Sequence, residues 1–317
     1  MPVKDSPYCP VFPFGNGHIQ TIYPVLFRKI PSLVYTRERI TTADDDFLDL
    51  DWSTPGNNRL AIVSHGLEGN STRTYVKAMV QALNHGGWDA LAWNYRSCSG
   101  EPNRQLRSYH NGATDDLARV IDHARKKGKY KEIALVGFSL GGNLTLVHLG
   151  RDRVDPIVKK AVVFSVPCDL AASAEALEKP SNRLYMKRFL VLLHRKIKEK
   201  MAIMPHALDD KGYDRIKTFR QFDDRYTAPI HGFKDARDYW EKCSSLQFIP
   251  KIDRPCLIIN ALNDPFLPQE CFPIAQAGQN PNITLKLPKS GGHVGFVSFK
   301  GRYWSEDQAV WFLNRPG

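Results

Sequence analysis

The chain has 317 residues, of which 42% are hydrophobic, and a formal net charge of +11 at pH 7. This length can bury one large core, and a single domain with an insertion fits it better than two equal domains. No stretch approaches the ~18 apolar residues of a membrane span, and the first residues lack a signal-peptide pattern. The six cysteines show neither metal-ligand spacing nor a disulfide framework. We therefore expect a soluble cytoplasmic protein.

Strand-like and helix-like segments alternate along the chain, a pattern typical of a mostly parallel sheet with helices on both faces. Two segments with alternating polarity come first, and six apolar runs follow. Helical periodicity occupies 72–85 and 114–127, in connections between these runs. The sequence thus predicts an α/β fold with an eight-stranded sheet, with strands at 34–40, 47–52, 60–64, 90–94, 133–138, 161–166, 256–261 and 283–287.

The interval 168–250 is too long for a simple connection between two strands. Its periodicity is helical, so we interpret it as a helical lid inserted after the sixth strand. The core would then consist of 1–167 and 251–317.

The apolar run at 133–136 leads directly into Gly-Phe-Ser-Leu-Gly at 137–141. A strand that enters Gly-x-Ser-x-Gly and continues as a helix forms a turn so tight that the flanking residues can carry almost no side chain. Such a turn lifts the hydroxyl of Ser139 clear of the sheet and directs the N–H of Leu140 to where an oxyanion would form. A chance Gly- and Ser-rich turn is the alternative, but the flanking strand and helix favour a nucleophile.

A serine hydroxyl needs a base to take its proton, and one of the ten histidines is well placed for this role. His293 lies in a glycine-rich loop at 290–296, after the last predicted strand and before a terminal amphipathic segment at 304–313. We therefore expect His293 to be the base.

The base needs a carboxylate to hold its tautomer, and two candidates compete. Asp264 follows the strand at 256–261, and Asp169 follows the strand at 161–166. We favour Asp264 because the penultimate strand is the usual source of this residue, whereas Asp169 also fits the N-cap of a helix.

A second oxyanion donor is expected from the loop after the third strand, where His-Gly-Leu-Glu-Gly occupies 65–69. The glycines at 66 and 69 would let the N–H of Leu67 face the site. Structural roles are favoured for His65 and Glu68.

The chain order Ser139, Asp264, His293 is that of α/β-hydrolases. Over nearly its whole length the chain resembles the YheT-like branch of this superfamily, regarded as serine esterases related to eukaryotic lipid-hydrolysing proteins. The resemblance rests on seven blocks that occur in order, at 16–21, 65–69, 94–104, 137–143, 222–229, 264–266 and 291–296.

This resemblance implies that Ser139, Asp264 and His293 form a triad, with Leu67 and Leu140 as the oxyanion donors. The chain departs from the family at Ser97, where the family favours glycine. The departure concerns the backbone of that loop and not the triad.

The expected activity is hydrolysis of carboxylic esters with short to medium acyl chains, including acylglycerol-like lipids, through an acyl-enzyme. This chemistry needs no metal and no organic cofactor. An acyltransferase or a thioesterase with the same triad remains an alternative, as does a non-catalytic binding protein.

Positive charge is concentrated in the predicted lid, where 179–220 holds twelve Lys or Arg against four acidic residues. Such a run is commonly a solvated helix face. It could also bring the lid to anionic membranes, with Phe189 and Leu190 beside the cations, and make the protein peripheral to a membrane. Nucleic-acid binding is not expected, because no aromatic-basic recognition module accompanies the charge.

Overall fold

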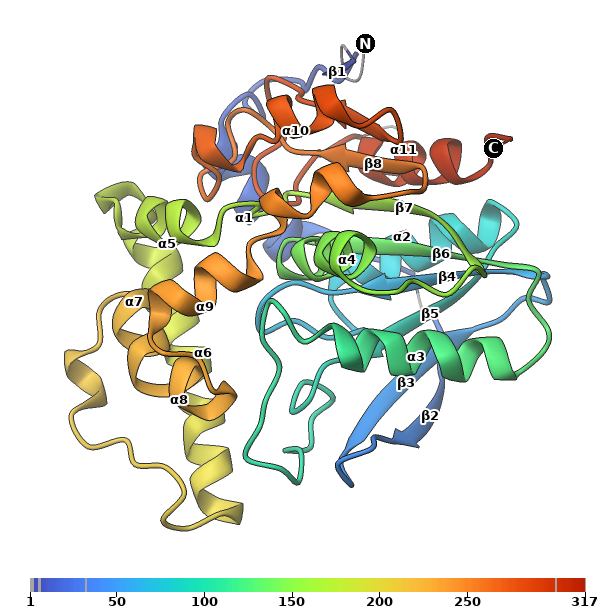
Figure 1. The fold of residues 1–317 in the computed structure, drawn as a ribbon. Helices are drawn as coiled ribbons and strands as arrows, with labels where there is room; N and C mark the ends of the chain where they lie inside the picture. The colour runs from blue at the N-terminus through green and yellow to red at the C-terminus, as the bar shows by residue number, and fades with distance from the viewer. Residues whose placement is uncertain (1–2, 5–6, 32, 300, 317) are drawn as a thin grey trace.

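The computed structural model describes residues 3–4, 7–31, 33–299 and 301–316. In these residues one nine-stranded sheet has the order β1-β9-β8-β7-β6-β4-β5-β3-β2 (Figure 1). The pairs β2–β3 and β3–β5 are antiparallel, and all other neighbours are parallel. The strands are β1 Val3–Lys4, β2 Thr36–Thr41, β3 Phe47–Ser53, β4 Arg59–Ser64, β5 Asp89–Asn94, β6 Glu132–Phe138, β7 Val158–Phe164, β8 Cys256–Ile259 and β9 Ile283–Lys286.

All eight strands that the sequence predicts are present, with small shifts at their ends. The ninth strand is β1, which pairs with β9 at the sheet edge and is too short to show a pattern in the sequence. From β4 onward the parallel strands are almost completely buried. Continuous apolar runs in the sequence follow from this burial, because helices cover both faces of such strands.

Helices pack on both faces of the sheet. Leu117 of α3 and Leu144 of α4 belong to one core cluster, whereas Met79 of α2 and Phe312 of α11 belong to another. In Figure 1, α3 and α4 accordingly lie in front of the sheet, with α2 and α11 behind it. The helices are α1 Gly17–Phe27, α2 Thr74–His85, α3 Thr114–Lys126, α4 Leu140–Arg151, α5 Leu170–Glu178, α6 Arg183–Ile203, α7 Phe219–Phe222, α8 Ala228–His231, α9 Ala236–Cys243, α10 Ile274–Gln279 and α11 Trp304–Leu313.

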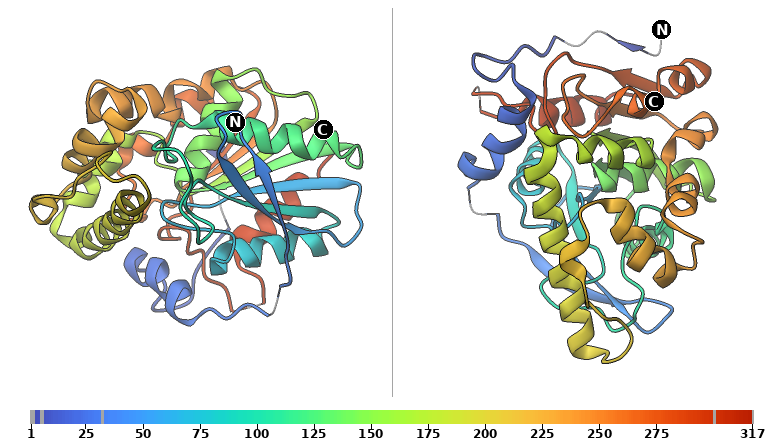
Figure 2. Two further views of the ribbon diagram at one scale, coloured as in Figure 1. Left: turned by 90° about the horizontal axis from the view of Figure 1, so that it is seen from below. Right: turned by 90° about the vertical axis from the view of Figure 1, so that its left-hand side faces the viewer.

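Five of these helices, α5 to α9, form the segment 168–250 between β7 and β8, called the inserted segment below. They lie together beside the carboxyl ends of the parallel strands (Figures 1 and 2). Their apolar side chains form a cluster of their own, in which Leu190 is only 7% exposed and Phe189 is partly buried. These two residues therefore point inward and do not flank the exposed cations as the sequence suggested.

Within the described ranges, none of the helices combines the length and the apolar character that a membrane crossing requires.

Candidate active site

Ser139 lies at the junction of β6 and α4 in a left-handed backbone conformation, with φ 52° and ψ −118°. The turn is sterically closed to side chains on either side. A Cβ added to Gly137 would lie 2.4 Å from the carbonyl oxygen of Gly141, and one added to Gly141 would lie 2.4 Å from that of Ser64. The two glycines are therefore required by close backbone approach, as the sequence motif indicated.

Three side chains from the ends of separate strands meet at this turn. The Nε2 atom of His293 lies 2.9 Å from the Oγ atom of Ser139. The Nδ1 atom of the same histidine lies 2.9 Å from Oδ2 and 3.2 Å from Oδ1 of Asp264. The structure thus brings Ser139, His293 and Asp264 into one hydrogen-bonded row, in which Nδ1–H donates to the carboxylate and Nε2 is free to accept from the hydroxyl.

Neighbouring elements hold the histidine loop and the carboxylate in place. The N–H of His293 donates to the hydroxyl of Thr21 on α1 at 2.9 Å, and the N–H of Val294 donates to the hydroxyl of Ser165 at 2.9 Å. Asp264 has a fully buried side chain and also accepts the N–H of Phe266 at 2.9 Å. Sequence reasoning missed Thr21 and Ser165, although Thr21 belongs to the block at 16–21.

Asp169, the competing carboxylate, has a different position. Its side chain accepts the N–H of Ala172 at 3.0 Å and caps the N-terminus of α5. It lines a surface depression together with Glu175 and Glu270, away from the residues that surround Ser139. The cap interpretation therefore accounts for Asp169.

The loop at 65–69, called the oxyanion loop below, is held by several hydrogen bonds. The carbonyl oxygen of Gly66 accepts from Nδ1 of His65 at 2.8 Å and from the N–H of Gly69 at 3.0 Å. This carbonyl and the N–H of Leu67 share one trans peptide, so fixing the first directs the second the opposite way. Burial lowers the pKa of His65 to about 3, so this histidine is neutral and structural, as expected from the sequence.

Two further N–H groups of the oxyanion loop are also occupied. The N–H of Gly66 donates to the hydroxyl of Tyr75 and that of Glu68 to the hydroxyl of Tyr109, both at 2.9 Å. In the part of the chain that the structure describes, the N–H groups of Leu67 and Leu140 have no protein acceptor. Both residues border the same cavity as Ser139, so their N–H groups are candidates for oxyanion donors.

This cavity lies between the sheet and the inserted segment, and it holds about 1230 Å³ of empty space, part of it open to solvent. Apolar side chains line most of it, among them Leu170, Leu177, Phe189, Leu193, Phe219, Phe222 and Phe266.

Comparison with known proteins identifies the family of this chain. The family model described as "alpha/beta hydrolase fold" matches residues 62–299. The chain belongs to the α/β-hydrolase family. It is 36% identical to "Putative esterase YheT" of Escherichia coli (strain K12), over 93% of this chain and 88% of that protein. It is 30% identical to "Phospholipase ABHD3" of Homo sapiens, over 93% of this chain and 75% of that protein.

A third relative is "Monoacylglycerol lipase" of Saccharomyces cerevisiae, 30% identical over 85% of this chain and 61% of that protein. Among solved structures, the Pyrococcus furiosus esterase Pf2001 has a TM-score of 0.61 at 18% identity, over 89% of this chain and 90% of that one. That likeness concerns the fold alone. Together the relatives make the chain an α/β hydrolase of the esterase and lipase type.

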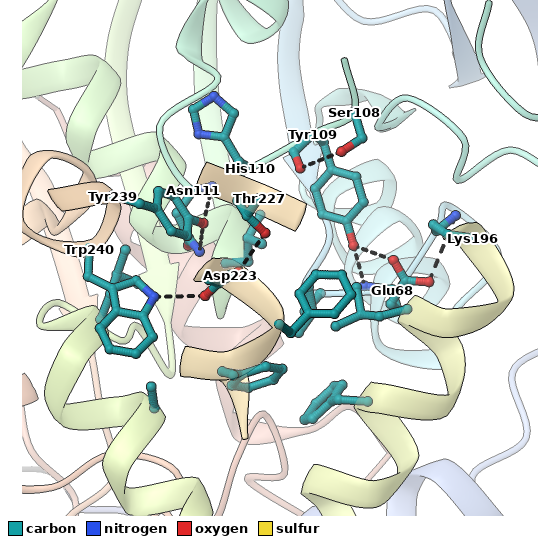
Figure 3. Close-up of a pocket in the computed structure, with 18 of the residues that line it drawn as sticks. Glu68, Ser108, Tyr109, His110, Asn111, Lys196, Asp223, Thr227, Tyr239 and Trp240 are labelled. Carbon is teal, nitrogen blue, oxygen red and sulfur yellow. Dashed lines mark hydrogen bonds and ion pairs between the residues drawn. The ribbon is translucent and has the colours of Figure 1, made fainter. Parts of the chain in front are cut away.

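Two groups of polar residues interrupt the apolar lining of this hydrolase's cavity (Figure 3). One centres on Glu68 and Tyr109. The other centres on Asp223, which accepts hydrogen bonds from the hydroxyl of Thr227 at 2.5 Å and the indole N–H of Trp240 at 2.8 Å. Burial raises the pKa of Asp223 to about 7. Apart from the motif blocks that contain Glu68 and Asp223, no sequence pattern indicated that these side chains face a cavity.

The departure at Ser97 has a direct structural reason. Ser97 has φ 62°, a left-handed conformation that glycine adopts without strain. Its hydroxyl donates to Oδ1 of Asn103 at 2.6 Å and accepts the N–H of Asn103 at 2.9 Å. A serine therefore fits this position because its side chain bonds across the loop.

No group of three or more His, Cys, Asp or Glu side chains that could hold a metal ion is found among the described residues.

Proposed function

We propose that this hydrolase cleaves carboxylic esters with Ser139 as nucleophile, His293 as base and Asp264 as the carboxylate that orients the base. The observation that carries the proposal is the row of contacts from Ser139 through His293 to Asp264, each at 2.9 Å. The relatives named esterase and lipase support the same chemistry.

In this mechanism the hydroxyl of Ser139 attacks the ester carbonyl while Nε2 of His293 takes its proton. The N–H groups of Leu67 and Leu140 stabilise the tetrahedral oxyanion. His293 then protonates the leaving alcohol, and an acyl-enzyme remains. Water activated by the same histidine releases the acid, and Asp264 stays ionised throughout.

The proposed substrates are esters with short to medium acyl chains, including acylglycerol-like lipids. Support comes from the apolar cavity wall that runs from Ser139 toward the inserted segment. We propose that the inserted segment acts as a lid, because Phe189, Leu193 and Phe219 cover the cavity from that side.

The test is hydrolysis of p-nitrophenyl esters from acetate to palmitate, together with labelling by a serine-reactive phosphonate. We expect the highest kcat/KM at short to medium chains, and the label on the peptide that contains Ser139. Products formed with competing alcohols would identify an acyltransferase. Folded protein that is neither labelled nor active would favour a non-catalytic binding role.

We also propose that the enzyme lies in the cytoplasm and meets its substrate at an anionic membrane surface. The support is that two neighbouring helices carry exposed apolar and exposed basic side chains. Val25 and Leu26 of α1 are 63% and 66% exposed, and Lys187 and Arg188 of α6 are exposed as well. The helices α1 and α6 are neighbours, as Figure 2 shows. The six free thiols suit a reducing compartment.

Residues His18 and Tyr185 join these two helices through a stacked ring pair and a contact of 3.2 Å between Nδ1 and the hydroxyl.

Cosedimentation with phosphatidylcholine vesicles, with and without phosphatidylserine, tests the proposed membrane contact. We expect binding only to the anionic vesicles, weaker at physiological salt than at low salt. Leu26→Gln should weaken it, whereas Ile274→Gln, at an exposed apolar site on α10, should not. Equal binding to both vesicles would contradict the proposal.

A further inference from the structure

Tyr109 lies 41 residues from Glu68 of the oxyanion loop in sequence and yet bonds to this residue twice. Its hydroxyl accepts the N–H of Glu68 at 2.9 Å and donates to Oε1 of the same residue at 2.6 Å (Figure 3). Glu68 directly follows Leu67, so Tyr109 fixes the peptide on the C-terminal side of Leu67. His65 and Gly69 fix the peptide on its N-terminal side.

Glu68 has a strained backbone that needs this support. Its φ is 53°, in the left-handed region that costs a non-glycine residue free energy. Besides the contact with Tyr109, its carbonyl oxygen accepts from Nη2 of Arg73 at 2.7 Å. If the hold on Glu68 were released, the backbone could relax and turn the N–H of Leu67 away from the site.

The second oxygen of the Glu68 carboxylate faces the inserted segment. Oε2 lies 3.8 Å from Nζ of Lys196, which comes from α6 (Figure 3). The same ammonium donates to the carbonyl oxygen of Ser97. The Glu68 side chain is only 6% exposed. Burial raises the pKa of Glu68, and Lys196 acts against this shift. Lys196 therefore helps to keep the carboxylate ionised and able to accept from Tyr109.

A second lysine of the same helix also bonds to the core. Nζ of Lys200, one turn further along α6, donates to the carbonyl oxygens of Asn103 and Gln105, both at 2.6 Å. Two lysines thus tie α6 to the core, and one of them reaches the oxyanion loop.

We propose that Tyr109 and Glu68 are positioning residues for the N–H of Leu67, and that Lys196 makes this position depend on α6 lying against the core. The oxyanion site is then complete only when the inserted segment is closed over it. This inference rests on the proposed esterase function, and it adds a link between lid closure and transition-state stabilisation.

The first test is Tyr109→Phe, which removes the hydroxyl and keeps the ring. Loss of a whole oxyanion donor costs about 10²–10³ in kcat, so misplacement of one donor is expected to cost about tenfold, with little change in KM. A trifluoromethyl ketone forms an oxyanion when Ser139 adds to it, whereas the matching methyl ketone binds largely without one. Tyr109→Phe should weaken only the trifluoromethyl ketone. Tyr226→Phe, which removes a hydroxyl bonded to Asp209 outside the cavity lining, is the control.

The second test is Lys196→Met, assayed with p-nitrophenyl acetate so that acyl-chain contacts with α6 contribute little. We expect a fall in kcat of the same order, recovery in Lys196→Arg, and no change in the exposed control Lys198→Met. The melting temperature of each variant shows whether it is folded.

Equal losses for both ketones, or wild-type kcat in folded Tyr109→Phe and Lys196→Met, would overturn the inference. Such a result would not change the phosphonate labelling at Ser139 or the esterase activity of the wild-type protein, which test the proposed function independently. A failure of the positioning role is therefore distinguishable from a failure of the esterase function.

Discussion

Ser139→Ala is expected to lower kcat for ester hydrolysis by roughly 10⁴- to 10⁶-fold. The hydroxyl oxygen of Ser139 attacks the carbonyl in the wild-type protein. A water molecule that takes its place in the variant is not held in position for the attack. KM should change little, because the cavity walls that bind the acyl chain remain. The rates are measured with the p-nitrophenyl ester of best kcat/KM, with wild-type protein in parallel.

Two further variants make this test independent of stability. Ser139→Gly should be equally inactive yet no less stable than Ser139→Ala, because glycine tolerates φ 52°. The double variant Ser139→Ala/His293→Ala should lose no more activity than either single one, because members of a triad act as a unit. Equal rates for folded wild-type protein and Ser139→Ala would place the activity at another site.

The sequence predicted the strands well, and it singled out the three side chains that the structure brings together, because both inferences depend on local patterns. Buried parallel strands require continuous apolar runs, and catalytic residues follow the strand ends at fixed places in the chain order. The tight turn at Ser139 is visible in the sequence as Gly137 and Gly141, because a side chain at either position would clash with the backbone. His293 stood out by its position after the last strand.

Contacts between distant segments could not be predicted in the same way. Thr21 bonds to the loop of His293 across 272 residues, and no local pattern encodes that pairing. The prediction that Phe189 and Leu190 lie beside the exposed cations of α6 was wrong for a related reason. Apolar and basic residues occur on several sides of this helix, so its sequence alone does not tell which side faces the core, and Phe189 faces the cavity.

Asp264→Asn is expected to lower kcat by about 10⁴-fold, the second large effect. The carboxylate accepts from Nδ1 of His293 and from the N–H of Phe266, and asparagine keeps its shape but loses its charge. An asparagine that turned its amide group toward the histidine would also favour the wrong tautomer, with a proton on Nε2. That atom could then no longer accept the proton of Ser139.

The matched variant Asp169→Asn separates the two carboxylates that the sequence left in competition. Asparagine is as good an N-cap as aspartate, so activity and stability should both stay close to wild type. Asp169→Ala should cost about 1 kcal/mol of stability through loss of the cap of α5, with kcat retained. Steady-state kinetics and thermal unfolding on the three variants measure this. If Asp169→Asn lost the activity that Asp264→Asn retained, Asp169 would replace Asp264 as the partner of His293. The loop that carries Asp169 would then have to adopt another conformation to reach His293.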